Sequence, residues 1–201
     1  MKAIFAALVL LTTGAAATLT STERENGVAE LEGSKKMFLD ATAGLSAAQW
    51  SFKSAPERWS IAECAEHIAL SEAYIFGFVS ERIVKGPATP EKRELAKGKD
   101  ELILKILQDR SHKATAPEAL DPTKKPMPAE DAVKLFLANR AKTIDFIQTT
   151  QEDLRDHFYD HPVQAFGTMD AYQWILFISG HTRRHTLQIL EVKADPNFPK
   201  N

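Results

Sequence analysis

Helical periodicity runs through most of this sequence and constrains the fold more than any other feature. Apolar side chains recur three and four residues apart in four long segments, at about residues 22–45, 60–79, 130–150 and 168–190. This spacing places them on one face of an α-helix. No stretch shows the alternation of apolar and polar residues that is typical of strands. The pattern therefore predicts an all-α protein.

Four amphipathic helices in one chain bury their apolar faces best against one another, which predicts a four-helix bundle. Residues 86–128, between the second and third main helices, hold six of the ten prolines. We therefore expect a long crossover there, with at most one internal helix near residues 95–108. A connection of this length inside a compact domain is usually functional or topological.

Capping residues fix the expected starts of two helices. Ser60 begins the second helix, and Glu63 three residues later completes a capping box. The Gly86–Pro87 pair ends the same helix region. Thr168 is the expected cap of the last helix, directly after the break at Gly167.

The first 17 residues have the pattern of a secretory signal peptide. A basic start at Lys2 is followed by a short apolar run and then by the small residues Ala15, Ala16 and Ala17. The run is too short to span a bilayer, which takes about 20 residues, although an uncleaved anchor is the alternative. We expect residues 1–17 to be removed, residues 18–201 to form the bundle domain, and the protein to be exported to the periplasm or the extracellular space.

Charge and cysteine content exclude several classes of protein. The formal net charge is −2, and loss of Lys2 makes it more negative. No dense basic cluster is present, which argues against nucleic acid as a partner. No later segment is apolar for long enough to insert stably in a membrane. A single cysteine, Cys64, excludes an internal disulfide.

Three histidines are the strongest candidate functional residues. His181 and His185 lie four residues apart in the last predicted helix, so their Cβ atoms are about 5–6 Å apart on one face. His67, in the second predicted helix, is the best candidate for a third ligand if the two helices are neighbours. Three imidazoles would leave coordination positions free on a metal ion. The alternative is three core histidines with one hydrogen bond each. Spacing alone does not decide between a metal site and core packing.

The segments around these histidines resemble the DinB-like superfamily of metal-binding four-helix proteins. The resemblance covers nearly all of the mature chain in helix order. It rests on a Trp-Ser start followed by Glu and His, and on a later His-x3-His followed by Gln and aliphatic residues, here Trp59, Ser60, Glu63, His67, His181, His185, Gln188, Ile189 and Leu190. It implies a divalent transition metal, most often zinc or nickel, held by His67, His181 and His185 at one end of the bundle.

Other residues near the histidines are weaker candidates for a functional role. Glu63 lies one turn before His67 and could carry protons, although capping explains it sufficiently. Tyr74 and Gln188 could line a pocket or simply pack. Arg184 could bind an anionic substrate at the pocket edge, or be a solvated charge. Cys64 could be a thiol ligand, but a small buried core residue is the commoner role.

Histidines outside the main helices offer a further hypothesis. His157 and His161 lie in a loop with Asp156 and Asp160, and His112 lies in the crossover. The loop residues could form a second site, although loop histidines are commonly just exposed.

The three-histidine pattern favours a metal-dependent hydrolase that acts on a small molecule, because such a metal can activate water. The first alternative is a non-catalytic module that binds metal or a small ligand. The second is a thiol-dependent transferase, which the resemblance permits but export disfavours, because low-molecular-weight thiols are kept mainly in the cytoplasm. The metal, the substrate and the oligomeric state, a homodimer included, stay open.

Overall fold

The computed structural model describes residues 18–111, 115–124 and 126–200. The predicted signal peptide, residues 1–17, and His112 lie outside the described residues. In chain order the elements are α1 (Ser21–Thr42), α2 (Ala47–Ser51), α3 (Ile61–Phe78), the π-helical turn η1 (Val79–Ile83), the 3-10 turn η2 (Pro90–Lys92), α4 (Arg93–Ala96), α5 (Asp100–Gln108), the 3-10 turn η3 (Glu118–Leu120), α6 (Ala129–Thr149), β1 (Phe158–Asp160), β2 (Thr168–Asp170) and α7 (Ala171–Lys193).

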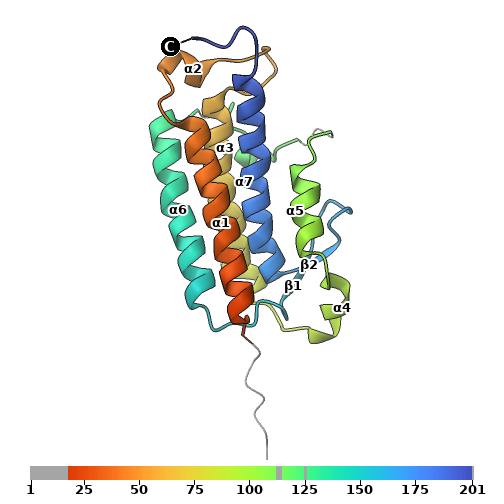
Figure 1. The fold of residues 1–201 in the computed structure, drawn as a ribbon. Helices are drawn as coiled ribbons and strands as arrows, with labels where there is room; N and C mark the ends of the chain where they lie inside the picture. Colours follow the sequence, from red (N-terminus) through yellow and green to blue (C-terminus); the bar gives the residue numbers. More distant parts are fainter. Residues whose placement is uncertain (1–17, 112–114, 125, 201) are drawn as a thin grey trace, which may run out of the picture.

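The long helices α1, α3, α6 and α7 form the predicted all-α bundle (Figure 1). α1 packs against α6 and α7, and α3 packs against the same two helices. The crossover carries the chain back along the bundle, so α6 runs in the same direction as α3, whereas α7 runs opposite to α3 (Figure 1). The second and last helices are therefore direct neighbours, which is the condition that a shared histidine site requires.

The capping box predicted for α3 is confirmed. The Glu63 amide donates to Ser60 Oγ at 3.2 Å, and the Ser60 amide donates to a Glu63 carboxylate oxygen at 2.7 Å. The cap predicted for α7 is wrong by two residues: Asp170, not Thr168, accepts from the Gln173 amide, at 2.7 Å. Thr168 belongs instead to β2, which pairs antiparallel with β1 in a short hairpin. Three-residue strands are too short to produce a recognisable alternation, so the sequence pattern missed them.

The crossover contains two helices where one was predicted, because Gly98 adopts a positive φ of 74° between α4 and α5. Ile103 and Leu107 of α5 are buried, and this helix packs along α7 (Figure 1). The close approach depends on Gly180 of α7, where an added Cβ would lie 2.6 Å from Leu107 Cδ1. Helix α5 of the crossover thus packs on the outside of the four-helix bundle.

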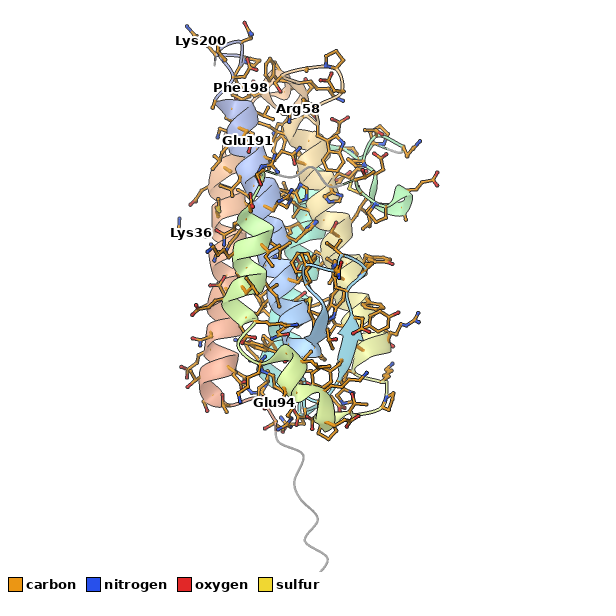
Figure 2. The ribbon with its side chains drawn as sticks, turned by 90° about the vertical axis from the view of Figure 1, so that its right-hand side faces the viewer. Lys36, Arg58, Glu94, Glu191, Phe198 and Lys200 are labelled. Carbon is orange, nitrogen blue, oxygen red and sulfur yellow. The ribbon has the colours of Figure 1, made fainter. Side chains whose placement is uncertain are left out.

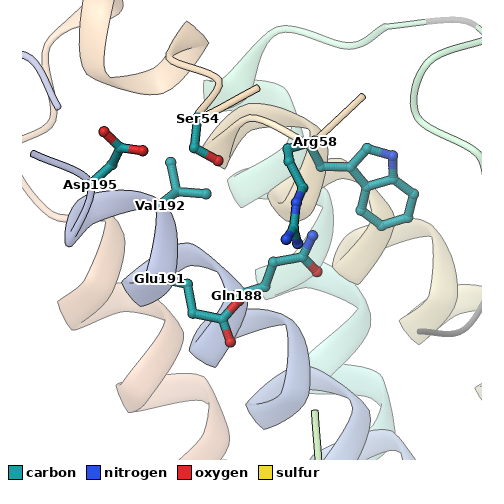
Figure 3. A pocket seen from close by; sticks show the side chains of 7 residues that line it. Ser54, Arg58, Gln188, Glu191, Val192 and Asp195 are labelled. Carbon is teal, nitrogen blue, oxygen red and sulfur yellow. The ribbon is translucent and has the colours of Figure 1, made fainter. Parts of the chain in front are cut away.

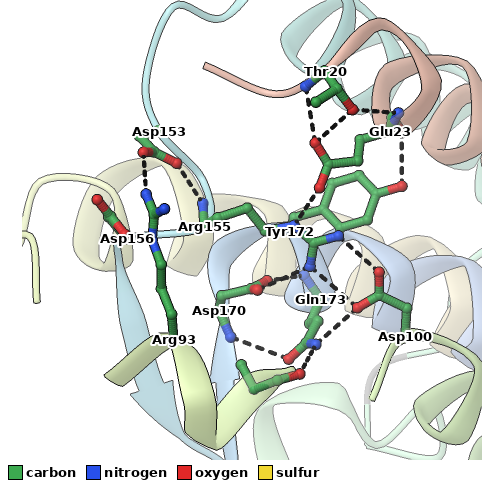
Figure 4. A network of polar contacts seen from close by, with 11 residues as sticks. Thr20, Glu23, Arg93, Asp100, Asp153, Arg155, Asp156, Asp170, Tyr172 and Gln173 are labelled. Carbon is green, nitrogen blue, oxygen red and sulfur yellow. Dashed lines mark hydrogen bonds and ion pairs between the residues drawn. The ribbon is translucent and has the colours of Figure 1, made fainter. Parts of the chain in front are cut away.

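Arg155 holds the first turn of α7 in place (Figure 4). Its guanidinium donates to Glu23 of α1 at 2.9 Å, to Asp100 of α5 at 2.7 Å and to the cap residue Asp170 at 2.9 Å. One cation therefore ties together the starts of α1, α5 and α7. This fixes α7, and with it the two histidines further along the helix.

The opposite end of the bundle is closed by α2 and the C-terminal segment. Phe198 packs edge-on against Phe52, and the Gln49 amide donates to the Pro199 carbonyl at 2.9 Å. Figure 2 shows Phe198 and Lys200 at this end and Glu94 at the other. Among the described residues, no helix is both long and apolar enough to cross a membrane.

Candidate metal centre

The structure brings His67, His181 and His185 together. His67 projects from α3 and the other two from α7, and one nitrogen from each ring lies within 4.8 Å of the others. The Nε2 atoms of His67 and His181 are 3.3 Å apart. This juxtaposition follows from the antiparallel packing of the two helices and from the four-residue spacing of the pair on α7. The three side chains form a group that could hold a metal ion.

Two of the rings are oriented by carbonyl oxygens. His67 Nδ1 lies 2.8 Å from the main-chain oxygen of Leu120, and His185 Nδ1 lies 3.0 Å from Gln188 Oε1. A carbonyl oxygen only accepts, so each Nδ1 carries the proton and each Nε2 is left with a free lone pair. Metal-binding histidines are commonly held in this way, with the second nitrogen donating to a carbonyl or a carboxylate.

Burial favours the neutral form of all three imidazoles. It lowers the pKa of His67, and it lowers the pKa of His181 and His185 well below the usual value, helped by the positive charge that the neighbouring rings would carry. Neutral imidazole is the form that binds metal. The donor set therefore suits a divalent ion near neutral pH.

Aromatic side chains cover the histidines on two sides. The Trp59 ring lies 4.8 Å from the His67 ring and 5.9 Å from the His185 ring, measured between centroids. Phe177 stacks on His181 with a centroid distance of 6.2 Å. His67 and His185 are 3% and 9% exposed, whereas His181 is half-buried. His181 is therefore the most exposed of the three rings.

The weaker candidates from the sequence differ in their contacts and exposure. The Glu63 carboxylate is occupied by its cap and by Lys53 Nζ at 2.6 Å. The Tyr74 side chain is 60% exposed. Arg184 donates to the main-chain oxygens of Leu107 and Asp109, so it fastens the end of α5. Gln188, also a pocket candidate, contacts the centre directly through His185 Nδ1.

Cys64 and the loop histidines do not join the three-histidine group. Cys64 is buried in the apolar core, and burial raises the pKa of its thiol. His161 packs against Trp174 and Phe177, with ring centroids 5.1 and 5.0 Å away. Within the described residues, His157 and His161 belong to no cluster that could hold a metal.

Sequence reasoning missed the part played by Leu120. Its contribution is a main-chain oxygen from the crossover, which no side-chain motif could signal. The crossover is kept near α3 by the Met127 amide, which donates to Glu66 at 2.7 Å. The long connection thus supplies part of the environment of the centre.

Comparison with known proteins identifies the family of the chain. The sequence model of the DinB superfamily matches residues 30–189, which include all three histidines. The chain belongs to the DinB superfamily. It is similar to the uncharacterized protein YuaE of Bacillus subtilis strain 168, with 28% identity over 150 residues that cover 75% of this chain and 86% of the relative. No solved structure matches the chain significantly.

Proposed function

We propose that this DinB-superfamily protein binds one divalent transition metal, zinc or nickel, through His67, His181 and His185. The observation that carries the proposal is the convergence of three neutral imidazoles, two of which are oriented by carbonyl oxygens. The same rings in a purely structural role would not need three nitrogens within 4.8 Å of one another.

We further propose that the protein is a hydrolase acting on a small molecule. A metal held by three imidazoles with free positions can act as a Lewis acid and make water a better nucleophile. The chain would contribute the ligand geometry through Leu120 and Gln188, and Trp59 and Phe177 would limit access of bulk water. The half-buried edge at His181 would admit the substrate.

The direct test of metal binding is elemental analysis of the protein lacking residues 1–17. About one equivalent of a transition metal is expected in the wild type, with strong loss in His185→Ala. His161→Ala is the matched control, because it removes a half-buried histidine outside the group and should retain the metal. Absence of metal in the wild type, even after reconstitution with zinc or nickel, would refute the proposal.

A non-catalytic binding module is the second candidate, and the low exposure of His67 and His185 favours it. Azide titration of the cobalt-substituted protein separates the two functions. A visible spectrum that changes with azide indicates a free coordination position and supports the enzyme. A spectrum that azide leaves unchanged supports the closed site of a binding module.

Export is the remaining part of the proposal and rests on the N-terminal sequence pattern. Expression of the full chain in a bacterial host should yield protein outside the cytoplasm that begins at Thr18. Protein that stays in the cytoplasm and retains residues 1–17 would contradict export without affecting the metal centre.

A further inference from the structure

A second hollow lies beside the candidate metal centre. A cavity of about 190 Å³ separates the segment that precedes α3 from the last turns of α7 (Figure 3). Its lining includes Ser54, Arg58, Trp59, Gln188, Glu191 and Asp195. The three histidines are not among the lining residues, but Gln188 contacts His185 and Trp59 packs on His67 and His185. The cavity is therefore a neighbour of the centre and a separate site.

Arg58 is the positively charged residue that lines this cavity. Its guanidinium points toward the Gln188 amide in Figure 3, and it makes no hydrogen bond or ion pair with the residues in the described part of the chain. Arg184 differs, since it donates to the Leu107 carbonyl at 3.2 Å. Arg110 also differs, because it holds both carboxylate oxygens of Glu191, at 2.6 and 2.8 Å.

The charged residues that line the cavity are Arg58, Glu191 and Asp195, and two further arginines, Arg110 and Arg184, lie near Glu191. The hydrogen bonds from Arg110 lower the pKa of Glu191, and the charges of Arg58 and Arg184 lower it further. Because Arg110 donates to both carboxylate oxygens of Glu191, the hydrogen-bond donors of the Arg58 guanidinium are left for a ligand. Asp195 lines the cavity across from Arg58 in Figure 3, and one of its carboxylate oxygens accepts from the Asn197 amide at 2.8 Å.

Gln188 supplies the second donor. Its Oε1 accepts from His185 Nδ1 at 3.0 Å, so the side-chain NH2 group lies on the other branch of the amide. An arginine fork next to an amide donor is the arrangement that recognises a planar carboxylate. The Trp59 ring and Val192 offer apolar surface for the rest of a small molecule. We propose that this cavity binds the carboxylate group of a small molecule through Arg58 and Gln188.

The site goes beyond the proposed metal chemistry and does not depend on it, so metal-free protein is used in the test. Propionate and propionamide have similar shape, but only propionate is charged at neutral pH. Each is titrated at constant pH and ionic strength while proton–nitrogen correlation spectra are recorded. We expect propionate to shift the Gln188 side-chain signals and to bind about tenfold more tightly than propionamide, as a charge-assisted hydrogen bond implies.

Removal of a charge should change the affinity for propionate in opposite directions at Arg58 and at Asp195. Arg58→Gln should weaken propionate binding about tenfold, whereas Asp195→Asn should strengthen it by removing a repulsive charge. Lys92→Gln is the matched control, because it removes an exposed positive charge next to Glu94, at the end of the bundle away from Arg58 and Glu191 (Figure 2). Its affinity should equal that of the wild type.

Three results would overturn the proposal. Equal affinity for propionate and propionamide would exclude recognition of a carboxylate, and needs no variant. Wild-type affinity in Arg58→Gln would remove Arg58 from the site. Propionate binding that leaves the Gln188 signals unchanged would place the ligand elsewhere. Each result leaves the metal analysis of His185→Ala unaffected, so the two proposals fail separately.

Discussion

Replacement of Arg140 by methionine should be among the most destabilising changes in this protein. The Arg140 and Glu72 side chains are both fully buried, and two hydrogen bonds of 2.8 and 2.7 Å join them. Arg140 also donates to Ser34 Oγ at 2.7 Å and to Thr182 Oγ1 at 2.9 Å. The guanidinium thus links α6, where it originates, to α1, α3 and α7. Its loss leaves the Glu72 carboxylate with the Thr143 hydroxyl at 3.0 Å as its remaining described partner.

The expected loss of unfolding free energy is about 3–5 kcal/mol, because the change leaves a buried charge without its counter-ion. The double replacement Arg140→Met with Glu72→Leu removes both charges and keeps most of the volume. It should therefore be more stable than Arg140→Met alone, by about 2 kcal/mol or more. Lys134→Met is the control on the same helix, where the side chain is 72% exposed, and should change stability by no more than about 0.5 kcal/mol.

Equilibrium urea unfolding followed by circular dichroism measures these differences, provided that the slope of unfolding free energy against urea concentration stays the same across the variants. A loss below about 1 kcal/mol for Arg140→Met would refute the argument, since it would mean that water or another cation compensates Glu72. A double variant no more stable than Arg140→Met would show that lost packing, and not the unpaired charge, causes the effect.

The remaining predictions concern the histidine centre. The metal-free protein should lose stability as the pH falls below about 6.5, because burial lowers the pKa of His67, His181 and His185 in the folded state and the unfolded chain then binds more protons. The slope of unfolding free energy against pH is at most about 1.4 kcal/mol per unit for each histidine, and an equal slope in His185→Gln would contradict this origin. Gln188→Leu should weaken zinc binding about 10- to 100-fold in a chelator competition, because His185 loses the oxygen that orients it; unchanged affinity would remove Gln188 from this role.

The sequence predicted the helical framework because each long helix carries its own signal. Apolar spacing identified α1, α3, α6 and α7, and the Ser60 and Glu63 pair placed the start of α3. Local signals failed where tertiary contacts decide the conformation. Thr168 has the chemistry of a cap, but it pairs in the β hairpin, and Asp170 caps α7 instead.

The histidine group was predictable because His181 and His185 have helical spacing and because the resemblance to the DinB-like superfamily adds His67 as the third ligand. The contacts around it were not. A main-chain oxygen is the same in every residue, so nothing in the sequence distinguished Leu120. Arg58 and Arg184 are likewise equivalent as letters, and only their hydrogen bonds show that Arg184 fastens α5 while Arg58 faces a cavity.

The dependence of the centre on the crossover leads to a prediction at a residue that is not a ligand. Leu120 contributes its main chain, so no side-chain replacement at that position removes the bond to His67. Glu66, 3% exposed, accepts from the Met127 amide seven residues further along the crossover. Glu66→Ala should therefore make the orientation of the His67 ring less well defined and weaken zinc binding. The effect should be smaller than the 10- to 100-fold loss expected for Gln188→Leu. Glu66→Gln keeps an acceptor oxygen and should bind zinc as the wild type does. Equal affinity in the alanine and glutamine variants would show that the crossover does not need Glu66 to orient His67.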